Sequence, residues 1–204
     1  MMNSYIIPHP PRIRSVINDF VVYHDSFEGN QDPYLWNDKF LHSYCKITNM
    51  KNEEAQINFW VSADIRPNFN QLLCDCVFVV SEKHFWAERN NIERNDSIVD
   101  NDNAFDHHYN WAHQHPFTRR RRYTLKADSD RSFQPQTEHR VLFDILPYLN
   151  NIGIETNSLR QEMFPSWRSK YYKFDHELGE MLYNHIFTES RIKLFGADLQ
   201  NIHT

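Results

Sequence analysis

The sequence predicts an α+β fold, with a mixed or antiparallel central sheet, helices packed on it and a helical C-terminal part. Two observations predict it: strand-like patterns occupy the first half of the 204 residues, and helical periodicity appears in the second half. The chain is 40% hydrophobic and 15% aromatic, which is typical of a folded protein that buries a core. We expect a single domain over residues 1–204, with a long functional loop around residues 88–118.

Three segments of the first half are predicted to be strands. Residues 20–24 are β-branched and aromatic and end before a turn-rich stretch. Ile57, Phe59 and Val61 alternate with Asn58, Trp60 and Ser62. This is the period-two pattern of a half-buried strand over residues 57–61. Residues 76–80 are apolar at every position, which favours a central strand covered on both faces. A looser helical register predicts a helix from about residue 33 to residue 47.

Two helices are predicted in the second half. Thr137 is expected to cap a helix that begins at Glu138. Pro147 should end or kink this helix, and Gly153 should terminate it. Asp175 is expected to cap the other helix. The apolar faces comprise Val141, Leu142, Ile145 and Leu149 in the first helix, and Leu178, Met181, Leu182, His185 and Ile186 in the second.

Composition argues against several classes of protein. The formal net charge of −5 does not suit binding of nucleic acid by the whole surface, so such binding would need a local basic patch. The four glycines do not cluster, which argues against a Walker loop or a dinucleotide-binding loop. Any phosphate would therefore be recognised by side chains. No G-x-S-x-G motif occurs, so α/β-hydrolase chemistry is not expected.

The cysteines and the apolar stretches bear on where the protein works. Three cysteines and no secretory signal pattern favour reduced thiols in the cytoplasm. Cys74 and Cys76 lie in an apolar, strand-like stretch, and we expect small buried residues there rather than metal ligands. No stretch approaches the ~18 apolar residues of a membrane span. We expect a soluble, cytoplasmic protein with no membrane partner.

Residues 107–122 hold four histidines and four arginines in sixteen positions, the densest chemistry in the chain. Imidazole can act as acid, base or metal ligand, and guanidinium binds phosphate and carboxylate in a fork. His113 and His115 are the candidate catalytic residues, as general acid or base beside arginines that hold an anionic substrate. The candidate ligand-binding residues are His107, His108, Trp111, Arg119, Arg120, Arg121, Arg122, Lys126, Asp128, Arg131 and Gln134.

The four arginines precede good β-formers, so we expect them to belong to a strand. Alternation places Arg119 and Arg121 on the inner face, with the apolar side chains that follow. The outer face is a cationic stripe of Arg120, Arg122 and Lys126. The inner pair needs an anion, which is either an acid of residues 93–106 or a ligand phosphate. An Asp-Ser-Asp turn at residues 128–130 is expected to end this strand.

These features predict an intracellular protein that binds a phosphate-bearing ligand, nucleic acid or nucleotide, through residues 107–136. The prediction extends to an enzyme that modifies this ligand if a histidine acts as acid or base. Two other interpretations stay open. One is a metal-dependent hydrolase in which His113 and His115 are metal ligands. The other is a non-catalytic protein-interaction module whose arginines pair with the acids of residues 93–106. The sequence points to no particular cofactor.

Overall fold

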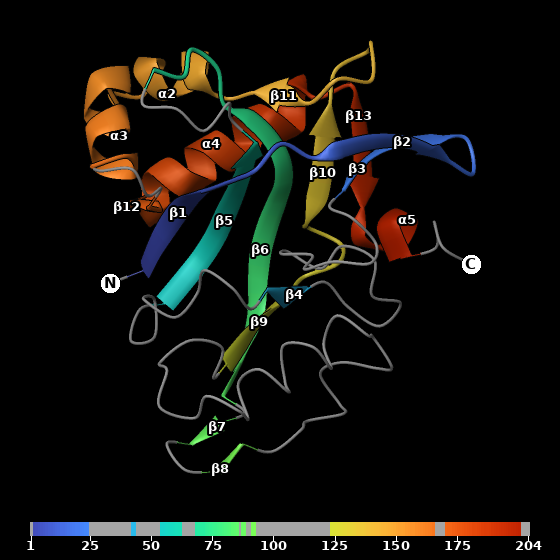
Figure 1. Ribbon diagram of the computed structural model, residues 1–204, viewed down its shortest axis with the longest axis horizontal. Coiled ribbons are helices and arrows are strands. Elements are labelled where there is room, and N and C mark those ends of the chain that lie inside the picture. Colours follow the sequence, from blue (N-terminus) through green and yellow to red (C-terminus); the bar gives the residue numbers. More distant parts are fainter. Residues whose placement is uncertain are drawn as a thin grey trace.

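The computed structural model describes residues 2–24, 42–43, 54–62, 68–85, 87–88, 91–92, 123–165 and 170–200. Within these residues, a nine-stranded mixed sheet forms the centre of the molecule, and the helices come from the C-terminal part of the chain (Figure 1). The predicted α+β fold is therefore confirmed.

The six strands along the main path of the sheet are β1 (Met2–His9), β5 (Glu54–Ser62), β6 (Leu73–Phe85), β10 (Phe133–Gln136), β12 (Tyr172–Asp175) and β13 (Ile192–Phe195). Three further strands join this sheet: β4 (His42–Ser43), β9 (Tyr123–Ala127) and β11 (Phe143–Asp144). Two small sheets are separate: β2 (Ile13–Ile17) with β3 (Phe20–His24), and β7 (Ala87–Glu88) with β8 (Asn91–Ile92). The described helices are α2 (Leu146–Asn151), α3 (Thr156–Met163), α4 (His176–Glu189) and α5 (Gly196–Gln200).

The strand order is β12-β1-β5-β6-β10-β13, so the long strand β6 lies near the middle of the sheet. The first half of β6 pairs with β5, β10 and β11, and its second half pairs with β9. β1 and β5 run parallel, which places their carboxyl ends, His9 and Ser62, side by side in register. The other pairs of described strands are antiparallel.

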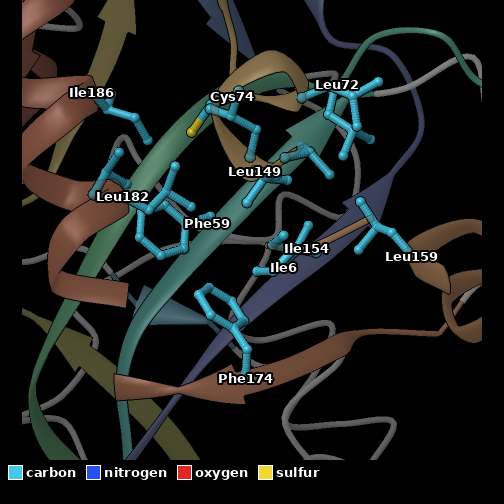
Figure 2. Packing of buried hydrophobic residues seen from close by; sticks show 14 of the residues in the cluster. Ile6, Phe59, Leu72, Cys74, Leu149, Ile154, Leu159, Phe174, Leu182 and Ile186 are labelled. Atoms are coloured by element: carbon cyan, nitrogen blue, oxygen red, sulfur yellow. The ribbon is translucent and has the colours of Figure 1, made fainter. Parts of the chain in front are cut away.

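One face of the sheet packs against α2, α3 and α4 to form the main hydrophobic core. Figure 2 shows aliphatic side chains of the helices lying over aromatic and aliphatic side chains of the strands. The labelled core residues are Ile6, Phe59, Leu72, Cys74, Leu149, Ile154, Leu159, Phe174, Leu182 and Ile186. Burial of this apolar surface is the main favourable term in the stability of the fold.

Gly179 lets α4 approach β1 very closely. A Cβ atom at this position would lie 2.5 Å from the Cβ atom of Ser4, and closer still to the Ser4 hydroxyl. Only glycine fits the helix against the strand at this distance, so Gly179 sets how deeply α4 sits on the sheet.

The three predicted strands are confirmed. Residues 20–24 form β3, residues 57–61 lie within β5, and residues 76–80 lie within the central strand β6. The helix expected over residues 33–47 lies mostly outside the described residues. Where it can be compared it is wrong, because His42–Ser43 is a strand that pairs with β9.

The first helix of the second half begins later than expected. The chain turns at residues 137–140, where Arg140 has a φ of +57°, and then forms β11 beside β6. α2 starts at Leu146, and the Asp144 carboxylate accepts a hydrogen bond from the Leu146 amide. Pro147 lies in the first turn, where its lack of an N–H has no cost, and so it does not end the helix. Gly153 follows the C-cap with a φ of +89°, as expected of a terminator.

α4 begins after Asp175 as expected, although the Asp175 side chain makes no capping hydrogen bond. The expected apolar face is partly wrong: Leu182 and Ile186 are buried, but Met181 is 46% exposed and Tyr183 is buried in its place. Among the described helices, none has the length and apolar character that are needed to cross a membrane.

Candidate functional site

Most of the predicted site lies outside the described residues. This applies to His107, His108, Trp111, His113, His115, Arg119, Arg120, Arg121 and Arg122. It also applies to the loop expected at residues 88–118, apart from Glu88 and β8 at its start. The roles given to these residues stay predictions.

The strand that follows the arginines is described from Tyr123 onward. β9 is held between β6 and β4 by antiparallel pairing. Leu125 and Ala127 are both buried, as the expected inward face of this strand requires. Lys126 lies between them in β9; its place on the outer face stays a prediction.

The Asp-Ser-Asp turn is confirmed, and it positions Arg131. The Asp128 carboxylate accepts hydrogen bonds from the amides of Asp130 and Arg131, at 3.0 and 3.1 Å. The Arg131 side chain is 47% exposed, with Nη2 3.7 Å from the Glu180 carboxylate and the guanidinium 5.3 Å from the centre of the Tyr183 ring. Arg131 is therefore a cation that contacts α4 and still reaches solvent.

Gln134 connects the β2–β3 hairpin to the sheet. Its amide group accepts a hydrogen bond from the Tyr23 amide and donates one to the Tyr23 carbonyl, so it completes the edge of β3 as a neighbouring strand would. It also donates to the backbone carbonyl of Asp75, at 3.0 Å. Gln134 is fully buried, and these bonds give it a structural role; its predicted role in ligand binding stays a prediction.

A second polar group surrounds Asp75 on the sheet face opposite the helices. Trp60 of β5 pairs with Cys76, and the next residue pairs with Cys74, so Asp75 is the extra residue of a β-bulge. The Asp75 carboxylate contacts Nε2 of His9 and accepts a hydrogen bond of 2.6 Å from the Ser62 hydroxyl. The bulge thus brings Asp75 to the carboxyl ends of β1 and β5, and we call His9, Arg12, Ser62 and Asp75 the Asp75 cluster.

The Asp75 carboxylate is charged although it is fully buried. Burial by itself raises the pKa of Asp75, but the charges of His9 and Arg12 and the hydrogen bonds from His9 and Ser62 outweigh burial and lower that pKa. The Arg12 Nε atom lies 3.5 Å from the other carboxylate oxygen. A buried ion pair of this kind is weak support for stability, because removing the charges from water costs several kcal/mol per ion by order of magnitude.

Several buried polar atoms on the same face have no hydrogen-bond partner among the described residues. They are Nδ1 of His9, both amide atoms of Asn58 and the indole Nε1 of Trp60. Asn58 is fully buried, Trp60 is 1% exposed, and the rings of His9 and Trp60 have centres 6.0 Å apart. Buried polar groups nearly always have a partner in folded proteins, so a concentration of such atoms on one face needs an explanation.

No group of three or more potential metal ligands occurs among the described residues. Cys74 and Cys76 are free and fully buried, as predicted. Burial, followed by the neighbouring charge of Asp75, raises the pKa of both thiols well above its ordinary value, which makes them poor nucleophiles.

The Asp75 cluster was missed at the level of sequence, although one signal was present. Asp75 is a lone acid within the apolar stretch 72–80, where a central strand would otherwise carry only apolar side chains. His9 and Arg12, by contrast, lie in a proline-rich segment near the N-terminus with no distinguishing pattern.

Comparisons with protein-family models, curated proteins and solved structures found no match to this chain.

Proposed function

We propose that this protein binds a phosphate-bearing ligand, nucleic acid or nucleotide, through residues 107–136. The observation that supports it most is the anchoring of β9. This strand directly follows the arginine run, and its pairing with β6 and β4 and the burial of Leu125 and Ala127 hold its start in the sheet. A cationic segment that is fixed to a sheet at one end can present its charges in a defined direction.

The chemistry of the segment suits phosphate. The alternation predicted from the sequence puts Arg120 and Arg122 on one face with Lys126, which corresponds to a spacing of about 7 Å between successive charges along a strand. Guanidinium groups bind phosphate oxygens in pairs, and a row of them suits a polyanion. Arg131, which is exposed beyond the turn, adds a further cation. His113 and His115 would supply acid or base chemistry if the protein also modifies this ligand.

We also propose a cytoplasmic location, which the free thiols of Cys74 and Cys76 support.

The test compares two double variants that remove the same charge. Arg120→Ala/Arg122→Ala removes the outward pair, and Arg14→Ala/Arg191→Ala removes two exposed arginines elsewhere in the fold. Binding of a fluorescent mixed-sequence oligonucleotide, single-stranded and duplex, is measured by anisotropy at several salt concentrations. We expect the first variant to bind more weakly and to reduce the salt slope by about 1.5 to 2, because two phosphate contacts are lost.

The control variant should keep the wild-type slope. Equal binding by the wild type and the Arg120/Arg122 variant would contradict the proposal. Parallel titrations with nucleoside mono- and triphosphates separate the two ligand classes, because a nucleotide site would bind these and not the oligonucleotide. No binding of either class by the wild type would overturn the proposal.

A further inference from the structure

We propose that the buried sheet face around Asn58, Trp60 and the His9–Asp75 pair is a binding site for a nucleobase. The choice of a base among small polar molecules rests on the proposed function, whereas the site itself rests on the geometry of the described residues.

Burying a charge on this sheet face costs free energy. The neighbours of Asp75 in β6 are Cys74, Cys76 and Val77, which are all fully buried. An apolar residue in place of Asp75 would pack there without any desolvation cost. A charged carboxylate that is held by His9, Arg12 and Ser62 is therefore a feature that stability alone does not require, and such features concentrate at functional sites.

The Asp75 carboxylate orients the His9 ring. Asp75 contacts Nε2 of the ring, so Nδ1 is the ring nitrogen that is left for another partner. Nδ1 is buried and has no partner among the described residues. The carboxylate thus orients the ring and leaves Nδ1 without a partner among the described residues, as a carboxylate orients the ring of a metal-binding histidine and leaves its other nitrogen for the metal.

Asn58 and Trp60 supply both donors and an acceptor for hydrogen bonds on this face. The Trp60 indole offers one donor, and the Asn58 amide offers two donors and an acceptor oxygen. These two residues share a face of β5 about 7 Å apart, and Trp60 is next to His9. A matching molecule must carry both donors and acceptors along its edges. Nucleobases do so, and an asparagine amide can bind the edge of adenine with two hydrogen bonds.

Aromatic residues flank Asn58 on the neighbouring strands. Asn58 lies in register between Tyr5 of β1 and Phe78 of β6, and both aromatic residues are fully buried. Aromatic side chains around an amide suit a flat heterocycle: once a base displaces the protein atoms that cover these rings, it can stack on them while the polar groups bind its edge. Asn58, Trp60 and His9 thus supply the edge contacts, and the aromatic neighbours supply the flat surfaces.

The experiment measures binding of uncharged nucleosides to the full chain. Adenosine, guanosine, cytidine and uridine are titrated by calorimetry into the wild type and into Asn58→Leu, Trp60→Phe and Ser4→Ala. We expect at least one nucleoside to bind and to lose roughly tenfold or more in affinity in Asn58→Leu and Trp60→Phe, because each variant removes hydrogen bonds to the base. Ser4→Ala is the matched control, because Ser4 also has a buried unpartnered hydroxyl but faces α4.

Thermal unfolding gives an independent readout. Because Asn58→Leu replaces polar atoms that lack partners among the described residues by apolar atoms of similar volume, it should keep or raise the melting temperature of the ligand-free protein while it weakens binding. A merely structural role would lower the melting temperature instead. Trp60→Phe keeps the aromatic ring, so it decides the question if Asn58→Leu does not fold.

Two outcomes would overturn the inference: no nucleoside binds the wild type, as expected if these atoms bind only water, or binding is unchanged in Asn58→Leu and Trp60→Phe. The result is separate from that for the arginines. Nucleosides carry no phosphate, so Arg120→Ala/Arg122→Ala should leave their binding unchanged. Loss of one effect without the other identifies which proposal is wrong.

Discussion

On the sheet face that α4 covers, β5 contributes Phe59 among aliphatic neighbours, whereas on the opposite face the same strand contributes Asn58 and Trp60. Both faces are buried, so the hydrophobic effect acts on both. The α4 face is built from apolar groups whose packing explains their burial. The opposite face holds a charged carboxylate and several polar atoms whose burial costs free energy. The difference shows that burial alone does not separate core from site; hydrogen-bond satisfaction does.

The largest expected effect on stability comes from removing the charge of the polar face. Asp75→Ala leaves His9 and Arg12 buried without their carboxylate, and we expect a loss of about 3–5 kcal/mol in the free energy of unfolding. Urea denaturation measures it, with Asp130→Ala at an exposed turn position as control. A loss as small as that of the control would mean that the Asp75 cluster is not coupled as its geometry indicates.

The α4 face should respond as an ordinary core. Leu182→Ala deletes a fully buried side chain of α4, and we expect a loss of about 2–5 kcal/mol from the lost burial and the cavity. Met181→Ala is the matched control, because this neighbour is 46% exposed and should lose far less. Nucleoside binding should survive Leu182→Ala in any population that is folded. A selective loss of binding would mean that the two faces are not independent.

How much was predictable from sequence differs between the two faces. Period-two alternation over residues 57–61 identified β5 and its apolar face without any long-range information. The Asp75 cluster could not be assembled in that way, because His9 reaches Asp75 only through the parallel pairing of β1 with β5 and the bulge in β6. The chain separates these two residues by 66 positions. Sequence patterns report local periodicity, and they do not report which distant strands become neighbours.

The misplaced start of the first helix has the same cause. The apolar spacing around Val141 and Ile145 fits a helix locally, but residues 143–144 instead pair with the start of β6. Asp144 then accepts hydrogen bonds from the amides of Leu72 and Leu146 and so fixes both the strand and the start of α2. The pairing with β6 outweighed the local helix propensity. Helix propensities of ordinary side chains differ by at most about 1 kcal/mol per residue, so such pairing easily overrides them.

The close contact between α4 and β1 gives a smaller and more specific prediction. Gly179→Ala places a methyl group against Ser4, and we expect a loss of about 1–3 kcal/mol from overpacking, partly offset by the better helix propensity of alanine. Ser4→Gly in the same chain removes the opposing side chain and should restore most of the loss. A double-mutant cycle of unfolding free energies measures this coupling. Additive effects would mean that the two residues do not limit the approach of the helix.

The smallest expected effect concerns a histidine at the rim of the apolar face. His185 of α4 stacks on Tyr148 of α2, with ring centres 3.7 Å apart. Burial lowers the pKa of His185, and the charge of Glu189 opposes this only in part. Because the folded-state pKa lies below the unfolded-state value of about 6.5, the unfolded state binds the proton more readily. The contribution of His185 is therefore present above about pH 6.5 and declines as the pH falls below it. Unfolding free energies at pH 7.5 and 5.5 should thus differ more for the wild type than for His185→Gln. An equal or smaller difference would show that Glu189 outweighs burial, and that a charge is tolerated on the α4 face as it is around Asp75.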